Sequence, residues 1–296
     1  MSLSLSVAPA MSHPVLPEDW TRAIVVATDG GASADAAVLA AGRLAGPESV
    51  DVVSVVATDD ALDGRPLTRV RSEALREQRE IVAAQVARIF GASHASRVTL
   101  RSGHPPAVIA SFAQVHGASL LVAGIGNTNV LERLRGDETT LRLARMTRIP
   151  LFAVASGRTV PPRTLVVATD FERSSMKTAR LATAIAGDDA EVLLVHVSAP
   201  WLPSAPHGAL KRFAENLQTG FRGFVRPIEL AGDPATELLA FAAVSRADVV
   251  AIGAHGRHSP SGGAIGSVAT RVVRCATCSV LLSPSDGSNA RLEGAL

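Results

Sequence analysis

Five glycines lie in one short connection near the C-terminus of the chain. The stretch 253–268 reads GAHGRHSPSGGAIGSV and lies between the apolar run ADVVAI and the helix-like stretch ATRVVRCA. Its spacing is G-x2-G-x9-G-S, from Gly253 and Gly256 to the pair Gly266-Ser267. The first two glycines let the backbone approach a ligand closely and can adopt the positive φ that a nest of N–H groups requires.

The last glycine of this connection opens a predicted helix. The unpaired N–H groups of residues 266–269 would favour an anion there, and the Ser267 hydroxyl adds a donor. Arg257 and His258 supply positive or switchable charge nearby. The pattern predicts a site for a di- or triphosphate, although the spacing alone also fits a flexible surface loop in which Ser267 is only a capping residue.

Two better-known phosphate-binding motifs do not fit this connection. A Walker A loop needs G-x4-G-K-[ST], and no lysine precedes Ser267. The Rossmann motif G-x-G-x-x-G follows a first strand, whereas this connection follows a fourth. P-loop and NAD chemistry are therefore not expected.

Composition excludes several classes of protein. The 296 residues are 47% hydrophobic and carry a net charge of +2, so the chain is long enough for two domains with cores. Lys177 and Lys211 are the only lysines and the charges are mixed, so nucleic acid is not an expected partner. No apolar run approaches the ~18 residues that span a bilayer, so no membrane association is expected. Two cysteines in one short segment fit a reducing compartment, and we expect a cytoplasmic protein.

The two halves of the chain are copies of each other. AIVVATDGGASADAAVLA (23–40) aligns with TLVVATDFERSSMKTARLA (164–182), which places Asp29 on Asp170 at an offset of 170 − 29 = 141. The same offset is expected in the next apolar run, where VVSVV (52–56) aligns with VLLVHV (192–197). Further on, RSGHPPAVIASFA (101–113) matches LAGDPATELLAFA (230–242) and ASLLVAGIG (118–126) matches ADVVAIGAH (247–255), at 253 − 124 = 129. The second copy is therefore expected to be 12 residues shorter between its second and third strands.

Each copy alternates short apolar runs with segments of helical period. In the first copy we expect strands at 23–28, 50–56, 97–101, 119–124 and 150–154, and helices at about 33–45, 67–90, 105–116 and 138–147. Such strands indicate a parallel sheet covered on both faces. The expected fold class is α/β, with two tandem five-stranded parallel, doubly wound, Rossmann-like domains of strand order 3-2-1-4-5. Ligands then bind outside the carboxyl ends of strands one and four, which ATDFERSS and the glycine-rich stretch follow in the second copy.

The expected domains follow from the repeat and from a break in composition. Residues 1–20 lack a basic n-region and a continuous apolar core, so they read as a flexible extension rather than a signal peptide. GRTVPPR (157–163) holds a glycine and a double proline, which mark a boundary. We expect domain 1 at 21–156, domain 2 at 162–284 and a flexible tail at 285–296. The helix at 67–90 is expected to be half core and half solvated face.

The motifs and the repeat described above resemble those of a known protein family. Each half resembles a universal stress protein domain, and the chain is similar to a tandem member of that family over residues 21–156 and 162–284. The matching pieces are VVATDF, VLLVHV, GAHG separated by nine residues from GSV, and a closing VLLS strand. The G-x2-G-x9-G-[ST] pattern is that of the ATP-binding members, so the resemblance implies a regulatory stress-response protein that binds ATP.

The resemblance also implies a role for each matching residue of the second copy. The residues expected beside the adenosine are Ala168, Thr169 and Asp170. Val197 would offer its backbone N–H and C=O to the adenine edge. The residues expected to wrap the ribose and first phosphates are Gly253, His255 and Gly256, with Arg257 nearby; those expected to hold the phosphate chain are Gly266, Ser267 and Val268. Ala269 stands where many ATP-binding members have a hydroxyl residue. A Mg or Mn ion could accompany the phosphates.

The same positions of the first copy differ. Gly124 is retained, but Gly256 becomes Asn127, and Gly266-Ser267 become Asp137-Glu138. One like-charge pair at about 4 Å costs ~4 kcal/mol at an effective dielectric of 20, which is ~3 decades of affinity. We therefore expect domain 1 not to bind ATP in this mode. Asp137 and Glu138 are equally consistent with the start of a helix, where acidic residues are favourable.

Two alternatives to a regulatory ATP-binding module remain open. The glycine-rich site shows no evident general base, yet slow ATP hydrolysis of the related adenine-nucleotide hydrolase type is the second candidate. The pairs His255/His258 and Cys275/Cys278 have the spacing of zinc ligands, although the apolar neighbours of the cysteines favour a core role.

The resemblance further implies how the two copies meet. In the family the closing strand pairs with the same strand of another domain, so LFAVA (151–155) and SVLLS (279–283) are expected to pair across an internal pseudo-twofold axis. Edge strands need a partner, and a covalent tandem supplies one at high effective concentration. We expect an internal pseudo-dimer, with a further homodimer as an open alternative.

Overall fold

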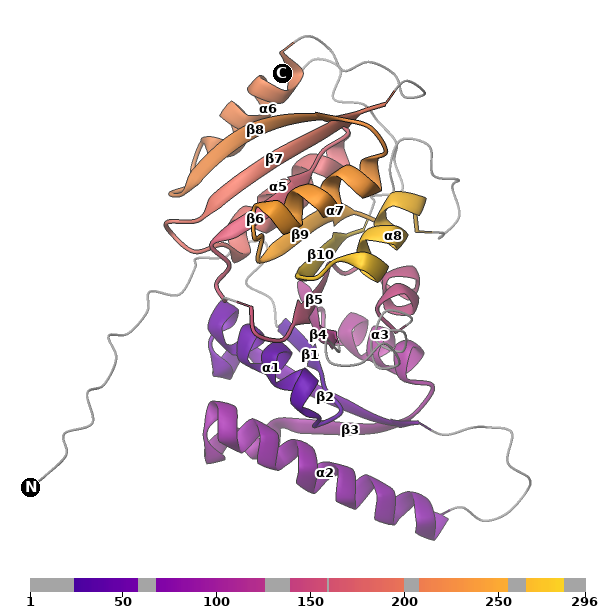
Figure 1. Ribbon diagram of the computed structural model, residues 1–296. Helices are drawn as coiled ribbons and strands as arrows, with labels where there is room; N and C mark the ends of the chain where they lie inside the picture. The colour runs from indigo at the N-terminus through magenta and orange to yellow at the C-terminus, as the bar shows by residue number, and fades with distance from the viewer. Residues whose placement is uncertain are drawn as a thin grey trace, which may run out of the picture.

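One continuous sheet of ten strands runs through both halves of the protein. The computed structural model describes residues 24–57, 68–125, 139–158, 160–199, 208–254 and 265–284. The strand order is β3-β2-β1-β4-β5-β10-β9-β6-β7-β8, so each half has the order 3-2-1-4-5 that the sequence predicts. Figure 1 shows β3 and β8 at the two ends of this sheet, with β5 and β10 in its middle.

The first half alternates strands and helices as its apolar runs predict. Its elements are β1 (Ile24–Ala27), α1 (Ala32–Ala45), the short 3-10 helix η2 (Pro47–Ser49), β2 (Val50–Ala57), α2 (Thr68–Phe90), the 3-10 helix η3 (Ala92–Arg97), β3 (Val98–Gly103), α3 (Pro105–Val115), β4 (Leu120–Ile125) and β5 (Leu151–Ala155). Residues 139–146 are helical as well.

The second half repeats this order with a much shorter second helix. Its elements are β6 (Thr164–Ala168), α5 (Arg173–Ile185), β7 (Glu191–Ser198), α6 (Ala209–Gln218), β8 (Phe224–Ala231), α7 (Pro234–Val244), β9 (Val249–Gly253), α8 (Ser267–Cys275) and β10 (Ser279–Ser283). Helix α6 has 10 residues where α2 has 23.

The strand register corrects the alignment of the two copies at one place. Ala27 pairs with Val53, whereas Ala168 pairs with Val195. The offset is 168 − 27 = 141 in the first strands but 195 − 53 = 142 in the second, so the expected offset of 141 for the second strands is wrong by one residue. The second half has one residue more between its first two strands, where 186–190 replace the turn that contains η2. The connection between the second and third strands is consequently 13 residues shorter in the second half, and not 12 as expected. Val53 pairs with Thr99 and Val195 with Ile228, so (99 − 53) − (228 − 195) = 13.

The two closing strands pair with each other, as the sequence predicts. Strand β10 runs antiparallel to β5, with Leu281 opposite Phe152. The backbone N–H of Ala155 donates to the Ser279 hydroxyl across this seam, over 3.1 Å. Every other strand pair in the sheet is parallel, so the change of direction falls where the halves meet. Each half thereby covers an edge that the other would otherwise expose.

Helices cover both faces of the sheet, and each face has a core that includes residues of both halves. On one face α1, α2, α5 and α6 pack with alternate strand residues, and on the other face α3, α7, α8 and the helical residues 139–146 do so. The inner side of α2 is buried at Val82, Gln85 and Val86 while Ile81 is exposed, which confirms the expected half-buried helix. None of the described helices has the length and apolar character that crossing a membrane requires.

Helix α7 begins with a side-chain cap that joins it to α8. The carboxylate of Asp233 accepts from the backbone N–H of Thr236 at 3.0 Å and from Arg271 of α8 at 2.7 Å. Pro234 occupies the first turn, where its missing N–H has no intrahelical partner to lose. The hydrogen bonds from Thr236, and then the charge of Arg271, lower the pKa of Asp233 from its usual 3.8.

We expect the Asp233→Ala variant to unfold at a lower temperature than the wild type at pH 7. The carboxylate has a lower pKa in the folded protein, so its contribution is complete above pH 3.8 and is lost as the pH falls through the folded value. The difference in melting temperature between the two proteins should therefore shrink below about pH 4. Thermal unfolding followed by circular dichroism from pH 7 to pH 3 tests this. Asp233→Asn, which keeps a capping acceptor, serves as the control.

Candidate functional site

Strands β6 and β9 are neighbours, so the segments that leave their carboxyl ends meet at one edge of the sheet. Val167 of β6 pairs with Ala251 of β9. The turn of residues 169–172 follows β6, and Gly253 is the last residue of β9. In doubly wound sheets, ligands bind at this place, outside the carboxyl ends of the first and fourth strands.

The turn after β6 is held by its own side chains. The backbone N–H of Phe171 donates to the Thr169 hydroxyl, and that of Glu172 donates to the Asp170 carboxylate. Ser175 of α5 is buried, and its hydroxyl also donates to the Asp170 carboxylate while accepting from the Asp170 N–H. Ala168, the last residue of β6, is half-buried and Thr169 is buried. Asp170 is therefore fixed by three hydrogen bonds within six residues.

The backbone of Val197 faces the end of β6. The N–H of Thr169 donates to the carbonyl of Val195 on β7, which marks the side of β7 that faces β6. Alternate residues of a strand direct their backbone groups to the same side, so the N–H and C=O of Val197 lie on this side too. Because β6 ends at Ala168, which pairs with Val195, the groups of Val197 lie beyond the last strand residue of β6. This placement is compatible with the role expected for Val197.

Helix α8 begins at the same edge of the sheet with its first turn uncapped by any described side chain. Gly266 is the N-cap residue, and its N–H donates to the carbonyl of Ala254 at 2.8 Å, which ties the helix start to the exit of β9. Ser267 and Val268 form the first turn with Ala269, which is buried, and this turn holds no acidic residue. The first N–H groups of a helix have no partner within it and favour an anion.

Several predicted positions lie outside the described residues. In the second half these are His255, Gly256, Arg257 and His258, from the middle of the glycine-rich connection. In the first half they are Asn127, Asp137 and Glu138. The contrast between the two copies that rests on Asp137 and Glu138 stays a prediction.

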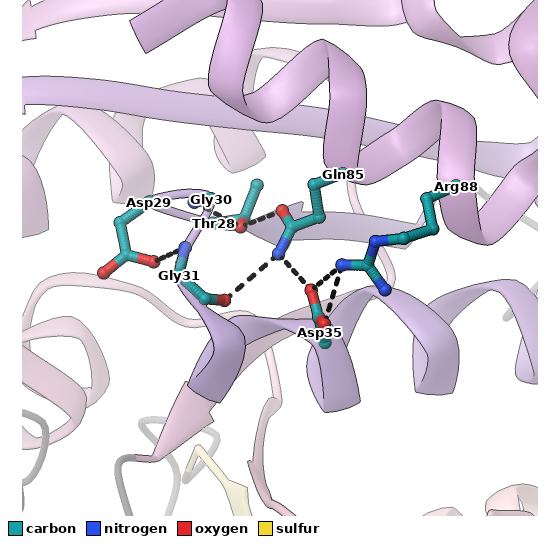
Figure 2. Close-up of polar contacts among 7 residues, drawn as sticks. All are labelled: Thr28, Asp29, Gly30, Gly31, Asp35, Gln85 and Arg88. Atoms are coloured by element: carbon teal, nitrogen blue, oxygen red, sulfur yellow. Dashed lines mark hydrogen bonds and ion pairs between the residues drawn. The ribbon is translucent and has the colours of Figure 1, made fainter.

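The first half holds its equivalent turn in a different way, with side chains from α2. Gln85 accepts from the Thr28 hydroxyl at 2.6 Å and donates to the Gly31 carbonyl and to Asp35 at 3.2 and 2.7 Å. Arg88 forms an ion pair with Asp35. Figure 2 shows these side chains as one chain of contacts from β1 to α2. Gln85 therefore uses both its oxygen and its nitrogen to hold this turn against α2.

Gly124, which the sequence presents as a retained glycine of the ligand site, lies against α1. A Cβ atom on Gly124 would lie 2.8 Å from the carbonyl oxygen of Ser33 and 3.1 Å from the Cα of Ala34. Both are backbone atoms at the start of α1, so they can give way only if the helix moves away from β4. Close packing of helix on strand is therefore sufficient reason for a glycine here.

We expect Gly124→Ala to lower the free energy of unfolding by about 1–3 kcal/mol, the usual cost of overpacking a close contact. Urea denaturation of the full chain measures this. Gly187→Ala is a suitable control, because the nearest contact of its new Cβ atom lies at 3.7 Å. Gly91→Ala is not suitable, because Gly91 has a φ of +97°, at which a residue with a Cβ atom is strained. A Gly124→Ala protein as stable as wild type would contradict the packing role.

The two cysteines have different surroundings. Cys275 is exposed at the end of α8, whereas Cys278 is buried before β10, and this burial raises the pKa of its thiol. A raised pKa opposes the thiolate form that zinc binds. No group of three or more His, Cys, Asp or Glu side chains that could hold a metal occurs among the residues that the structure describes. His255 and His258, the other two ligands of the zinc alternative, lie outside that part.

Sequence reasoning missed two residues that shape the turn after β6. Nδ1 of His196, on β7, lies 3.0 Å from the Thr169 carbonyl oxygen, and the His196 ring packs against Phe171. Phe171 has a φ of +66°. Phe171 could have been found from the alignment of ATDGG with ATDFE, which puts it on Gly30. A phenylalanine rarely replaces a glycine in a tight turn.

Comparison with known proteins agrees with this fold. The model of the universal stress protein family matches residues 21–155 and again 162–284, and the chain belongs to this family. A universal stress protein from Archaeoglobus fulgidus DSM 4304 is similar in structure, with a TM-score of 0.67 and 17% sequence identity over 90% of this chain and 97% of that one. A functionally unknown protein from Pseudomonas aeruginosa PAO1 has a TM-score of 0.56 and 18% identity over 90% of this chain and 93% of that one. A search of curated proteins finds no match.

Proposed function

We propose that this universal stress protein is a regulatory module that binds ATP, and that its second domain alone holds the nucleotide. The observation that carries the proposal is the start of α8. There Gly266 is tied to the exit of β9, the first turn is free of acidic residues, and no described side chain caps it. This leaves backbone N–H groups for the phosphates beside the Asp170 turn.

The contacts that hold the turn after β1 differ from those that hold the turn after β6, and this difference supports binding in the second domain alone. Gln85 reaches from α2 to the turn after β1, and Arg88 reaches to Asp35 in the first turn of α1 (Figure 2). The shorter α6 of the second half comes from a crossover with 13 fewer residues, and the second half holds its turn with β7 instead. In the first half α2 thus lies over the turn, whereas in the second half the matching contact comes from His196 of β7.

Calorimetric titration of the full chain with ATP, with and without Mg²⁺, tests the proposal. We expect one ATP per chain, and the nucleotide should be recovered unhydrolysed after hours of incubation. Binding of two ATP molecules per chain would contradict the restriction to the second domain. Absence of binding would overturn the proposal as a whole, and conversion of the bound ATP to ADP would favour the slow hydrolase.

A further inference from the structure

Phe171 has a backbone conformation that phenylalanine rarely adopts. Its φ is +66°, and it is one of two non-glycine residues with positive φ in the described parts of the chain. The first half has Gly30 at this position, with a φ of +82°. A side chain with a Cβ atom is disfavoured there, and such a conformation persists only where the surroundings enforce it.

Two rings enforce it in this protein. Phe171 is only 7% exposed, and its ring centroid lies 4.6 Å from that of His196 and 6.5 Å from that of Phe213 on α6. A carbonyl oxygen can only accept, so Nδ1 of His196 carries a proton and donates to the Thr169 carbonyl over 3.0 Å. His196 thus holds the turn at both ends, by a hydrogen bond to Thr169 and by ring packing against Phe171.

In the first half, side chains of α2 make the contacts with the turn that these rings make in the second half. A Cβ atom on Gly30 would lie 2.5 Å from a methyl group of Ile81, because α2 covers the turn there. Gln78 of α2 donates to the carbonyl of Asp29 at 2.7 Å and to the hydroxyl of Ser54 at 3.1 Å. In the corrected register Ser54 of β2 occupies the position of His196 of β7. Ser54 follows Val53, whose carbonyl accepts from the N–H of Thr28, and His196 follows Val195, whose carbonyl accepts from the N–H of Thr169. Gln78 of α2 thus makes in the first half the contact that His196 of β7 makes in the second.

Hydrogen bonds tie the residues of the turn after β6 to one another and to their neighbours. The backbone N–H groups from Thr169 to Glu172 all donate to protein acceptors, namely Val195, Ser175, Thr169 and Asp170. The Asp170 carboxylate is part of the same network, so its place is set wherever the turn is held. Val197, the other backbone contact expected for adenine, directly follows His196 in β7.

We propose that His196 and Phe171 are positioning residues for the nucleotide: the imidazole holds the strained turn so that Asp170 and the backbone of Val197 keep the spacing that the base and ribose need. This inference rests on the proposed function and adds to it a pair of side chains that do not touch the ligand. It also accounts for the strain, because a glycine at 171 would leave the turn without its ring contact to β7.

Calorimetric titration with ATP of the full-length wild type, His196→Leu, His196→Asn and Gln78→Leu tests the proposal. Loss of one hydrogen bond and its ring contact in His196→Leu is expected to weaken ATP binding about tenfold. The asparagine amide nitrogen can take the place of Nδ1, so His196→Asn is expected to recover most of this loss. Gln78→Leu removes the matching hydrogen bond in the first half and is expected to bind ATP as the wild type does.

Wild-type affinity in His196→Leu would overturn the positioning role, and so would an equal loss in Gln78→Leu, because the effect would then follow from loosening either half. Should His196→Leu fail to fold, Phe171→Gly replaces it. This variant relieves the backbone but removes the whole side chain with its ring contact, and it is expected to bind ATP about tenfold more weakly. Wild-type affinity in Phe171→Gly would likewise overturn the role. A wild type that does not bind ATP would instead overturn the proposed function itself.

Discussion

The Gly266→Glu variant is expected to bind ATP about a thousandfold more weakly than the wild type. A carboxylate placed at the start of α8 would face the phosphates, and one like-charge pair at about 4 Å costs ~4 kcal/mol at an effective dielectric of 20. Gly266 has φ −59° and ψ 153°, which any L-residue adopts, so glutamate does not strain the backbone. An acidic residue at a helix start also interacts favourably with the helix dipole.

The opposite effects expected on ATP affinity and on thermal stability separate a loss of binding from a loss of folding. Gly266→Glu should keep or slightly raise the melting temperature while its affinity for ATP falls. Gly266→Gln has the same size without the charge, so its affinity should fall much less. Calorimetric titration and thermal unfolding of both variants provide the measurement. Equal affinities in Gly266→Glu and wild type would show that the phosphates do not lie at the start of α8.

The largest effect on stability is expected from Phe152→Ala, with a loss of about 3–5 kcal/mol in the free energy of unfolding. Phe152 is 0% exposed and pairs with Leu281 across the seam between the halves. It belongs to the same buried cluster as Leu165 and Val167 of the second half and Val154 of the first. Removing its ring leaves a cavity in this cluster, to which both halves contribute residues.

Urea denaturation of Phe152→Ala and wild type measures this loss. Val115→Ala is the matched control, because Val115 is 79% exposed at the end of α3 and its truncation should change the free energy of unfolding by no more than about 0.5 kcal/mol. Since a domain is stable by only about 5–15 kcal/mol, the expected loss is a large share of the total. A loss below about 1 kcal/mol would show that the seam contributes little to the stability of the two halves.

The sequence predicts the elements of this fold closely because its strands are short and apolar throughout. The strands expected at 50–56 and 150–154 are found at Val50–Ala57 and Leu151–Ala155, and the helix expected at 67–90 is found at Thr68–Phe90. Buried parallel strands of this kind have few alternatives once helices separate them. The antiparallel meeting of β5 and β10 follows from the family resemblance and is confirmed.

The single-residue shift of the second strands could not be predicted from the alignment. VVSVV and VLLVHV are uniform enough to align in either register, and only the pairing of Ala168 with Val195 decides between them. The shift matters for the site, because it places His196 opposite Ser54 and thereby shows which residues hold the two turns.

The candidate site could be predicted only in part, for a similar reason. Glycine spacing and the Thr-Asp turn are local features, so they are visible in the sequence. The contacts that hold the turns join residues far apart in the chain, such as Gln78 with Asp29 and His196 with Thr169. Gly124 is a further case, since its spacing suggests a ligand site whereas its neighbours at Ser33 and Ala34 give it a packing role.

The antiparallel pairing of β5 with β10 leaves the sequences of the two halves free to diverge at their ligand sites. Strand β5 shields β10 by backbone pairing at Leu151, Phe152 and Ala153, which depends on no ligand. The first half can therefore pair with the second whether or not it binds a ligand itself. Because both halves are parts of one polypeptide, each meets its partner at a high effective concentration that does not depend on a second chain.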